Sequence, residues 1–240
     1  MSFLIDNKLI LQFVQMVYSH HLNQEDCLAC LWKSYNVLIC RQIAYMNKQD
    51  LRKTFIQKRK ALSSQAVRHA SHMIQQHFFQ NIPVELQKTV HIFLPIIKKN
   101  EIDTWLIINT LFQHYPQIQV ATSKAHLQQG TLSHYFLTPD TQLAQNAWGI
   151  NEPVDAPPCP IEQIDMVLVP LLCFDKQGHR VGYGKGFYDR FLAQCRPDIY
   201  KIGMSLFSPV ACIDDIQTRD IALDCCITPD QIIQCAESHA

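Results

Sequence analysis

The strongest constraint on the fold is a cluster of glycines: four of the chain's seven fall within nine residues, from Gly178 to Gly186. Before the cluster, residues 166–174 form a short apolar run with β-branched valines, which is typical of a buried strand. After it, apolar side chains from Phe187 to Cys195 recur at helical spacing and predict a helix that begins near Phe187. The segment therefore has the order strand, glycine-rich turn, helix.

This order suits the binding of phosphate. Glycine permits positive φ and lets a ligand approach the backbone amides closely, and the first amides of a helix have no internal partner and attract anions. Arg180 and Lys185 add two cations, one able to bind phosphate through two hydrogen bonds and one acting as a point charge. Asp189, in the first helical turn, is placed either to favour the helix dipole or to hold a Mg²⁺ ion that itself holds phosphate.

The same residues are compatible with a second interpretation, a β-hairpin with polar loop side chains. The spacing excludes two common nucleotide motifs. No Gly-Lys pair is followed by Ser or Thr, as a Walker A loop requires, and the third glycine comes one residue too early for a Gly-x-Gly-x-x-Gly dinucleotide fingerprint. The pattern alone leaves the ligand open.

Patterns of helix and strand alternate along the chain and predict an α/β fold with a mostly parallel sheet. We expect a loop at residues 146–160, which are rich in Pro, Asn and Asp, with Trp148 either packing there or covering a ligand. Glu101 follows the first strand, at the edge where open sheets bind ligands, although a loop glutamate is by itself most often an exposed charge. The expected helices are 48–60, one from an N-cap at Ser63 or Ser64 to about 79, and 104–114; the expected strands are 90–97, 118–121, 132–137, 199–207 and 226–228.

Charge and cysteine content limit the partners and the compartment. The 21 basic and 21 acidic side chains give a formal net charge of zero, so we expect neither nucleic acid nor a membrane as a partner. Ten cysteines in a chain of 240 residues fit reduced thiols in the cytoplasm better than a small disulfide scaffold. The apolar residues 9–18 are too few to span a bilayer and precede no cleavage site for a secretory signal.

Four stretches, in order, carry a resemblance to a known family. Arg180-Val-Gly-Tyr-Gly-Lys-Gly-Phe-Tyr-Asp189 closely resembles the signature of the 5-formyltetrahydrofolate cyclo-ligase family. Residues 48–63, then Phe93-Leu-Pro95 with Glu101-Ile-Asp-Thr104, and then Gly149-Ile-Asn-Glu-Pro153 are similar to its other motifs. The resemblance covers residues 46 to 230. It implies a three-layer α/β domain at 46–240, with helices on both faces of the sheet, and leaves 1–45 as an extension of unknown role that translation from an upstream start codon would explain.

The resemblance also implies the chemistry. The family uses ATP to phosphorylate the formyl oxygen of 5-formyltetrahydrofolate; N10 then attacks the activated carbon, 5,10-methenyltetrahydrofolate forms, and ADP and phosphate are released. Arg180 and Lys185 would stabilise the transferred phosphoryl group. The implied nucleotide contacts are Lys48, Gln49, Asp50, Leu51, Arg52, Arg180, Val181, Gly182, Tyr183, Gly184, Lys185, Gly186, Phe187 and Tyr188; the folate contacts are Glu101, Tyr183, Gly184, Lys185, Gly186 and Phe187; and the Mg²⁺ ligands are Asp189 and Asp220, with Asp224 as the other acidic candidate.

The chain departs from the family pattern at two places, and two other functions are compatible with its sequence. Phe187 stands where the family often has tyrosine, and the turn that leads to Glu101 is longer than expected. A sugar-phosphate isomerase or acyl-transferase relative would share the fold, and a binding protein without turnover would share the site. The four cations Lys48, Arg52, Arg180 and Lys185 favour a triphosphate ligand. We expect a monomer that acts on a small folate, with or without a polyglutamate tail.

Overall fold

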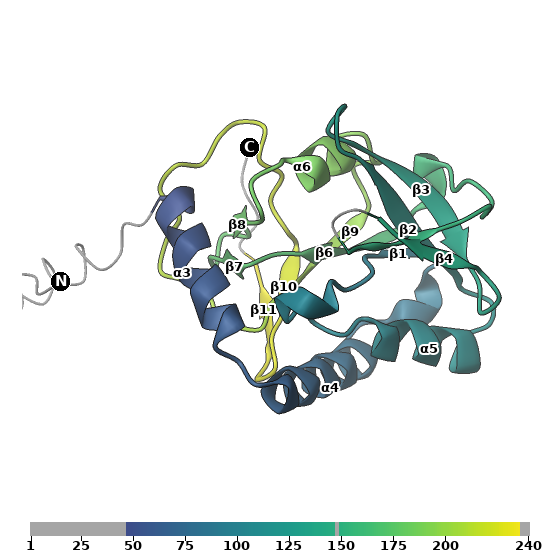
Figure 1. The fold of residues 1–240 in the computed structure, drawn as a ribbon, viewed down its shortest axis with the longest axis horizontal. Coiled ribbons are helices and arrows are strands. Elements are labelled where there is room, and N and C mark those ends of the chain that lie inside the picture. Colours follow the sequence, from purple (N-terminus) through teal and green to yellow (C-terminus); the bar gives the residue numbers. More distant parts are fainter. Residues whose placement is uncertain (1–46, 147–148, 236–240) are drawn as a thin grey trace, which may run out of the picture. The chain divides into compact units, whose positions relative to one another are not determined.

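The computed structural model describes residues 47–146 and 149–235, so the predicted extension at 1–45 and Trp148 lie outside the described residues. A seven-stranded sheet, in the order β11-β10-β9-β6-β1-β2-β3, forms the centre of the domain (Figure 1). The five inner strands are parallel, whereas β3 and β11 run antiparallel at the two edges. The strands are β1 (Thr89–Ile92), β2 (Gln119–His126), β3 (Thr131–Leu137), β6 (Met166–Pro170), β9 (Tyr200–Met204), β10 (Cys225–Ile227) and β11 (Ile232–Gln234).

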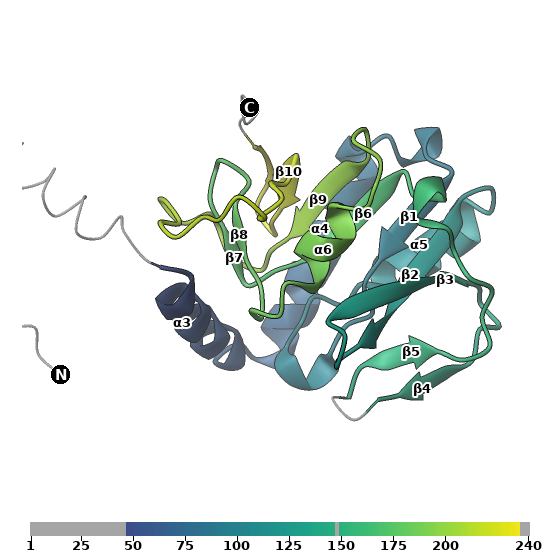
Figure 2. The same ribbon diagram turned by 90° about the horizontal axis from the view of Figure 1, so that it is seen from above.

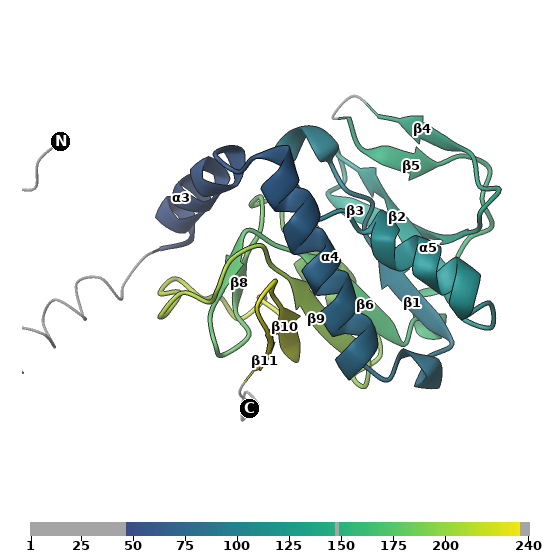
Figure 3. The same ribbon diagram turned by 90° about the horizontal axis from the view of Figure 1, so that it is seen from below.

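Helices cover both faces of the sheet, as the alternating pattern predicts. Figures 2 and 3 show α4 (Ser64–Asn81) and α5 (Trp105–His114) on one face, and Figure 2 shows α6 (Phe187–Leu192) on the other. Met166 of the central strand β6 packs in the core on the α4 and α5 side, whereas its neighbour Val167 packs with Phe191 of α6. Because successive strand residues point to opposite faces, one apolar strand supplies both cores. The result is the predicted three-layer α/β fold.

The helix α3 (Lys48–Lys60) is held beside the glycine-rich segment. Its first turn is capped by Asn47, whose side chain accepts from the amide of Asp50 at 2.9 Å. Its buried residues Leu51 and Phe55 pack against Val181 and neighbouring residues of the same segment. An apolar contact therefore brings the polar face of α3 to the glycines. The predicted helix has the observed bounds, and Ser63 caps α4 as expected.

The sequence predicts a single glycine-rich turn between a strand and a helix, but the structure divides this segment into two parts. A short hairpin comes first, in which β7 (Cys173–Phe174) pairs antiparallel with β8 (Arg180–Val181). Gly178 belongs to its turn, at φ +87°, where an added Cβ would lie 2.4 Å from the carbonyl oxygen of Leu223. The buried carboxylate of Asp175 accepts the amides of Gln177 and His179, both at 3.0 Å. The hairpin of the second interpretation is thus present, and it precedes a loop that contains the other three glycines, for which the phosphate-binding role stays a prediction.

Several strand bounds also differ from the predicted ones, and the differences open the site. The strand β1 ends at Ile92, not at 97, because its pairing with β6 ends there and Pro95 has no amide to donate. The strand β2 continues to His126, well past its last pairing with β1 at Ala121. The predicted loop at 146–160 contains β5, one strand of a hairpin that contacts β2. The elements missed from sequence are β4 (Leu143–Gln145), β5 (Asn151–Pro153), β11, and the short 3₁₀ helices η1 (Val84–Leu86), η2 (Ile97–Lys99) and η3 (Ile161–Gln163).

No helix within the described part of the chain is both long enough and apolar enough to cross a membrane.

Candidate active site

A cavity of about 700 Å³ opens at the carboxyl ends of the central parallel strands. Its walls are the start of α3, the segment after β1, the glycine-rich loop with α6, the loop before β10, and the strand β5. Ligands of open α/β sheets bind at this edge, because the loops there diverge from the strand ends. The predicted residues that line it are Lys48, Gln49, Arg52, Glu101, Arg180, Val181, Gly182, Tyr183, Gly184, Lys185, Gly186, Phe187, Tyr188, Asp189 and Asp220.

Two residues predicted to contact the nucleotide do not line the cavity. Leu51 is buried in the contact between α3 and the β7–β8 hairpin. Asp50 is exposed, and its amide and carboxylate both bond the side chain of Asn47 at the helix start. Residues adjacent in a helix point about 100° apart, so a run of five cannot all face one ligand. The helix presents Lys48, Gln49 and Arg52 to the cavity instead.

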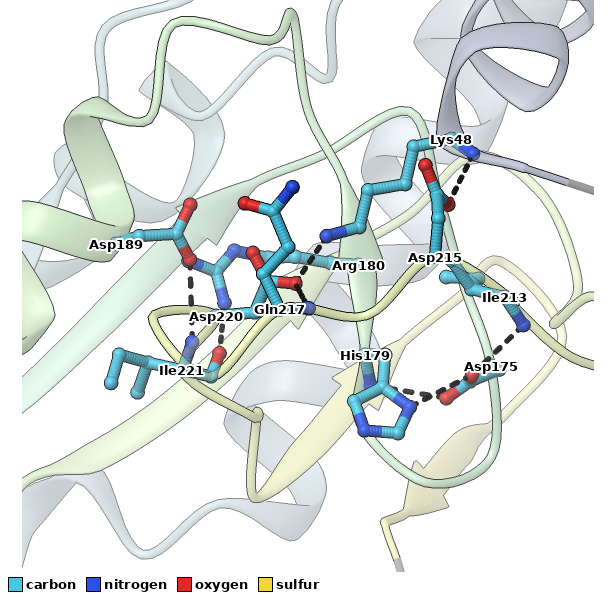
Figure 4. A network of polar contacts seen from close by, with 10 residues as sticks. All are labelled: Lys48, Asp175, His179, Arg180, Asp189, Ile213, Asp215, Gln217, Asp220 and Ile221. Carbon is cyan, nitrogen blue, oxygen red and sulfur yellow. Dashed lines mark hydrogen bonds and ion pairs between the residues drawn. The ribbon is translucent and has the colours of Figure 1, made fainter.

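Arg180 is locked in place at the base of the glycine-rich loop (Figure 4). Its guanidinium donates to Asp189 Oδ1 at 2.5 Å and to the carbonyl of Ile221, and the amide of Ile221 donates to the same Asp189 oxygen at 3.3 Å. Burial lowers the pKa of Arg180 from its ordinary value, while the charges of Asp189 and Asp220 oppose that shift. The side chain is therefore a fixed positive charge with little freedom to move.

A second ion pair joins α3 to the loop before β10 (Figure 4). The ammonium of Lys48 bonds Asp220 Oδ2, which also accepts the amide of Gln217 at 2.7 Å. Burial raises the pKa of Asp220, but the bonds from Lys48 and Gln217 outweigh it, and the net pKa is lowered. Asp224, the other acidic candidate, is paired with Lys201 at 3.0 Å and does not line the cavity. Asp220 is thus the acidic residue of this loop that faces Arg180.

Glu101 is buried, contrary to the expectation of an exposed loop charge. Only 6% of it is exposed. Its Oε2 accepts the amide of Ile96 at 2.8 Å, and its Oε1 accepts the hydroxyl of Tyr183 at 2.6 Å and lies 3.8 Å from the guanidinium of Arg59. The longer turn noted in the sequence is η2 followed by Asn100 at φ +51°, and it returns the chain toward the cavity. Both oxygens of Glu101 therefore have partners.

The glycine-rich loop itself is shaped around two arginines. Arg52 Nε donates to the carbonyl of Gly182 at 2.9 Å. Gly184 has φ +88°, and an added Cβ would lie 3.0 Å from the Arg52 guanidinium. Arg190 donates to the carbonyl of Lys185 at 2.7 Å. Within the described ranges no acceptor bonds the ammonium of Lys185 and no carboxylate pairs with it, so this cation is available to a ligand in the cavity.

A pair of buried histidines lies beneath α6. His91 Nε2 and His134 Nδ1 are 3.2 Å apart, and the ring of Phe191 contacts both imidazoles. Burial lowers the pKa of His134 to about 4 and, with a further effect from His134, lowers the pKa of His91 well below its usual range. Both rings are therefore neutral at neutral pH. They were not predicted, because a lone histidine in an apolar strand pattern carries no signal of its partner.

Sequence reasoning also missed several residues of the walls. Glu152 lies within Gly149-Ile-Asn-Glu-Pro153 and lines the cavity, but the sequence predicts no role for it. Arg59 does not line the cavity, but its guanidinium donates to the Tyr183 hydroxyl at 3.1 Å. Lys99, whose ammonium lies 4.5 Å from the centre of the Tyr183 ring, follows a strand as Glu101 does. Asp215 and Arg219 come from the loop before β10, where acidic or basic loop residues look like ordinary surface charges. Their position in loops next to strand ends is the signal in the sequence that could have indicated these residues.

The carboxylates of the cavity can hold Mg²⁺ only if a bound ligand supplies further oxygen atoms to the ion. Asp189 and Asp220 line the cavity on either side of Arg180. Across residues 47–146 and 149–235, no group of three or more His, Cys, Asp or Glu side chains is arranged to hold a metal. Mg²⁺ is commonly held by one or two carboxylates, with phosphate oxygens and water completing its shell. The two aspartates match that arrangement and do not form a site sufficient by themselves.

Comparisons with known proteins agree on one family. The model of the 5-formyltetrahydrofolate cyclo-ligase family matches residues 44–220. The 5-formyltetrahydrofolate cyclo-ligase of Mycoplasma pneumoniae is 32% identical over 67% of this chain and 85% of its own length; that of Escherichia coli is 26% identical over 73% and 97%. The solved structure of Aquifex aeolicus 5,10-methenyltetrahydrofolate synthetase is similar with a TM-score of 0.65 and 26% identity, over 81% of this chain and 96% of that one.

Proposed function

The chain belongs to the 5-formyltetrahydrofolate cyclo-ligase family, and from this premise we propose that the cavity at the carboxyl ends of the strands is its active site. The protein is a 5-formyltetrahydrofolate cyclo-ligase, and family membership implies a folate substrate and the use of ATP.

One observation carries the assignment of the cavity. Cations from two separate parts of the chain, α3 and the glycine-rich segment, converge on one wall, while apolar side chains line much of the remainder. The cationic part suits a triphosphate, and the apolar part suits a flat heterocycle. The cations are Lys48, Arg52, Arg180 and Lys185; the apolar residues include Phe93, Leu94, Ile96, Leu132 and Ile150.

The reaction needs positioning and charge stabilisation more than an enzyme nucleophile. The formyl oxygen attacks the terminal phosphorus of ATP, the bond from that phosphorus to the bridging oxygen breaks, and ADP leaves. The lone pair of N10 then attacks the formyl carbon, the carbon–oxygen bond to phosphate breaks, and N10 gives up its proton. Lys185, whose ammonium has no protein partner among the described residues, is suited to stabilise the negative charge on the phosphoryl group during its transfer.

Other groups hold the nucleotide in line. Arg180 supplies a fixed charge because Asp189 and the Ile221 carbonyl hold its guanidinium. Lys48 and Arg52 reach the cavity from α3 and close its nucleotide side. The helix α6 has six residues, so the amides of the loop before it, more than a long helix dipole, would bind the phosphate. Mg²⁺ held by Asp189, with support from Asp220, would neutralise phosphate charge when bound.

Further properties are proposed on more general grounds. We propose that the protein acts as a monomer. The seven cysteines of the described residues are free, which supports the reducing cytoplasm. The family model begins at residue 44, which supports a cyclo-ligase domain at 46–240 with 1–45 outside it. Size-exclusion chromatography and N-terminal sequencing of the native protein test the first and last of these.

The decisive assay mixes the purified protein with 5-formyltetrahydrofolate, Mg²⁺ and ATP and follows the near-ultraviolet absorbance of the methenyl product. We expect the band to grow only when ATP is present. Folate binding without growth of the band would instead identify a non-catalytic binding protein, and neither binding nor growth would mean that the glycine-rich loop serves another phosphate ligand.

A further inference from the structure

Glu152 is a buried carboxylate in the wall of the cavity opposite the glycine-rich loop. It lies in β5 and is 7% exposed, and its side chain lines the cavity. Burial of a carboxylate is unfavourable unless hydrogen bonds or a cation compensate for the lost water. The bonds that Glu152 makes therefore indicate what it is placed to do.

One oxygen of Glu152 is committed to the protein. The strand β2 outruns β1 beyond Ala121, so the backbone of β2 is left without a strand partner on that side. Oε1 of Glu152 accepts the amide of Ala125 at 3.0 Å in this stretch, and it accepts the side-chain amide of Asn146 at 2.9 Å. These two neutral donors fix the orientation of the carboxylate without neutralising its charge.

The other oxygen is open. Among residues 47–146 and 149–235, no group donates a hydrogen bond to Oε2, and no lysine, arginine or histidine pairs with the carboxylate. Oε2 is also absent from the enclosed polar atoms that lack a partner in this part of the chain, so it keeps some accessible surface, and Glu152 is among the residues that line the cavity. Glu101, the other buried glutamate of the walls, has partners on both of its oxygens. Glu152 is thus the buried glutamate with an acceptor left for a ligand.

From this geometry we propose that Glu152 is a substrate-binding residue that accepts a hydrogen bond from an N–H group of the tetrahydropterin ring. The inference rests on the proposed location of the active site. A tetrahydropterin carries several N–H donors around a flat ring, and a buried, oriented carboxylate oxygen forms a strong charge-assisted bond with such a donor. The apolar neighbours Leu132 and Ile150 in the same part of the cavity suit the ring itself.

The variant Glu152→Gln tests this role with little change of shape. Its amide oxygen can still accept from Ala125 and Asn146, while its amino group replaces the open oxygen and faces the substrate donor. We expect the dissociation constant and the KM for 5-formyltetrahydrofolate to rise about tenfold, with the KM for ATP unchanged within twofold. The matched control is Glu162→Gln in η3, an exposed glutamate outside the cavity, which should leave all three constants unchanged.

Wild-type protein is measured first, so that two failures are told apart. Absence of turnover by the wild type would overturn the proposed function, and absence of folate binding as well would overturn both proposals. Normal wild-type turnover together with an unchanged folate dissociation constant in Glu152→Gln would overturn the role of Glu152 alone. Should that variant fail to fold in a thermal melt, Glu152→Asp, which withdraws the open oxygen by one methylene, decides in the same way: weaker folate binding supports the role and unchanged binding overturns it.

Discussion

The two walls of the cavity handle charge in different ways. On the wall formed by the glycine-rich loop, half-buried charges are paired, Arg180 with Asp189 and Lys48 with Asp220, and no described residue pairs with Lys185. On the opposite side, Glu152 is oriented by neutral donors and no cation of the described chain pairs with it. The first wall is preorganised by ion pairs and presents a cation that no described residue pairs with, whereas the second presents a fixed acceptor. An anionic phosphate and a heterocycle with N–H donors need these two arrangements respectively.

The largest effect should come from the open cation. Lys185→Ala should lower turnover by about 100-fold, because stabilisation of charge on the transferred phosphoryl group is lost. The free energy of unfolding should stay within about 0.5 kcal/mol of the wild type, since a loop lysine without partners contributes little to stability. Steady-state rates and urea unfolding measure the two quantities.

Lys176→Ala is the control for this variant, because Lys176 is an exposed lysine in the hairpin turn outside the cavity. Turnover by Lys185→Ala within twofold of the wild type would remove Lys185 from the proposed mechanism.

The paired charges of the same wall should contribute more to the free energy of unfolding than Lys185 does. Asp189→Asn keeps the acceptor for Arg180 but removes the countercharge of a guanidinium that is 7% exposed. We expect a loss of about 2 kcal/mol in the free energy of unfolding, a value reduced from that of a fully buried pair because Asp189 is 27% exposed.

The matched comparison is Asp198→Asn, which breaks a surface pair with Arg196 in which the aspartate side chain is 71% exposed. It should cost less than about 0.5 kcal/mol. Equal losses of unfolding free energy in the two variants would mean that the Arg180–Asp189 pair stabilises the fold no more than an exposed pair does.

Acid should weaken the support beneath α6. The folded-state pKa of His134 is lowered to about 4, from an unfolded value near 6.5. The unfolded chain therefore binds the proton more readily between these values, and stability is full above pH 6.5 and falls as the pH drops toward 4. Between pH 7 and pH 5 we expect a loss of about 2 kcal/mol from this group.

Urea unfolding at the two pH values measures this loss. In His134→Gln the same pH change should cost less, since the titrating group has gone. An identical pH dependence in the variant and the wild type would show that other groups cause it.

The smallest expected effect concerns Glu101, whose oxygens both have partners, unlike those of Glu152. Tyr183→Phe removes the hydroxyl that occupies Oε1 of Glu101 and so frees that acceptor for the folate. We expect the folate dissociation constant to fall about threefold, because the substrate no longer competes with an internal hydrogen bond of modest net strength. Isothermal titration without ATP measures it. Weaker binding would instead mean that the Tyr183 hydroxyl holds Glu101 in its binding orientation.

Much of this site could be predicted from local patterns. Arg180 and Lys185 were identified by their place among glycines between a strand and a helix, and α3 by its apolar spacing, with the observed bounds. The sequence pattern does not show how one run of residues is divided between different contacts. Asp50 and Leu51 lie beside Lys48 and Arg52 in the chain, yet only the latter pair lines the cavity. Gly178 was grouped with the loop glycines but belongs to a hairpin turn.

The sequence by itself determined the layer order of the fold and the family, because each depends on residue types at short, regular spacing, and it predicts a phosphate-binding role for the glycine-rich loop. Only the tertiary structure decided which charges are paired and which are open. Lys48 bonds Asp220, which lies 172 positions away in the sequence, and Glu101 bonds Tyr183, which lies 82 positions away. Such contacts depend on where strands end and loops converge, and the bond that orients Glu152, from the amide of Ala125 to Oε1, follows from the unequal lengths of β1 and β2. No local pattern encodes that difference, since pairing between strands sets it.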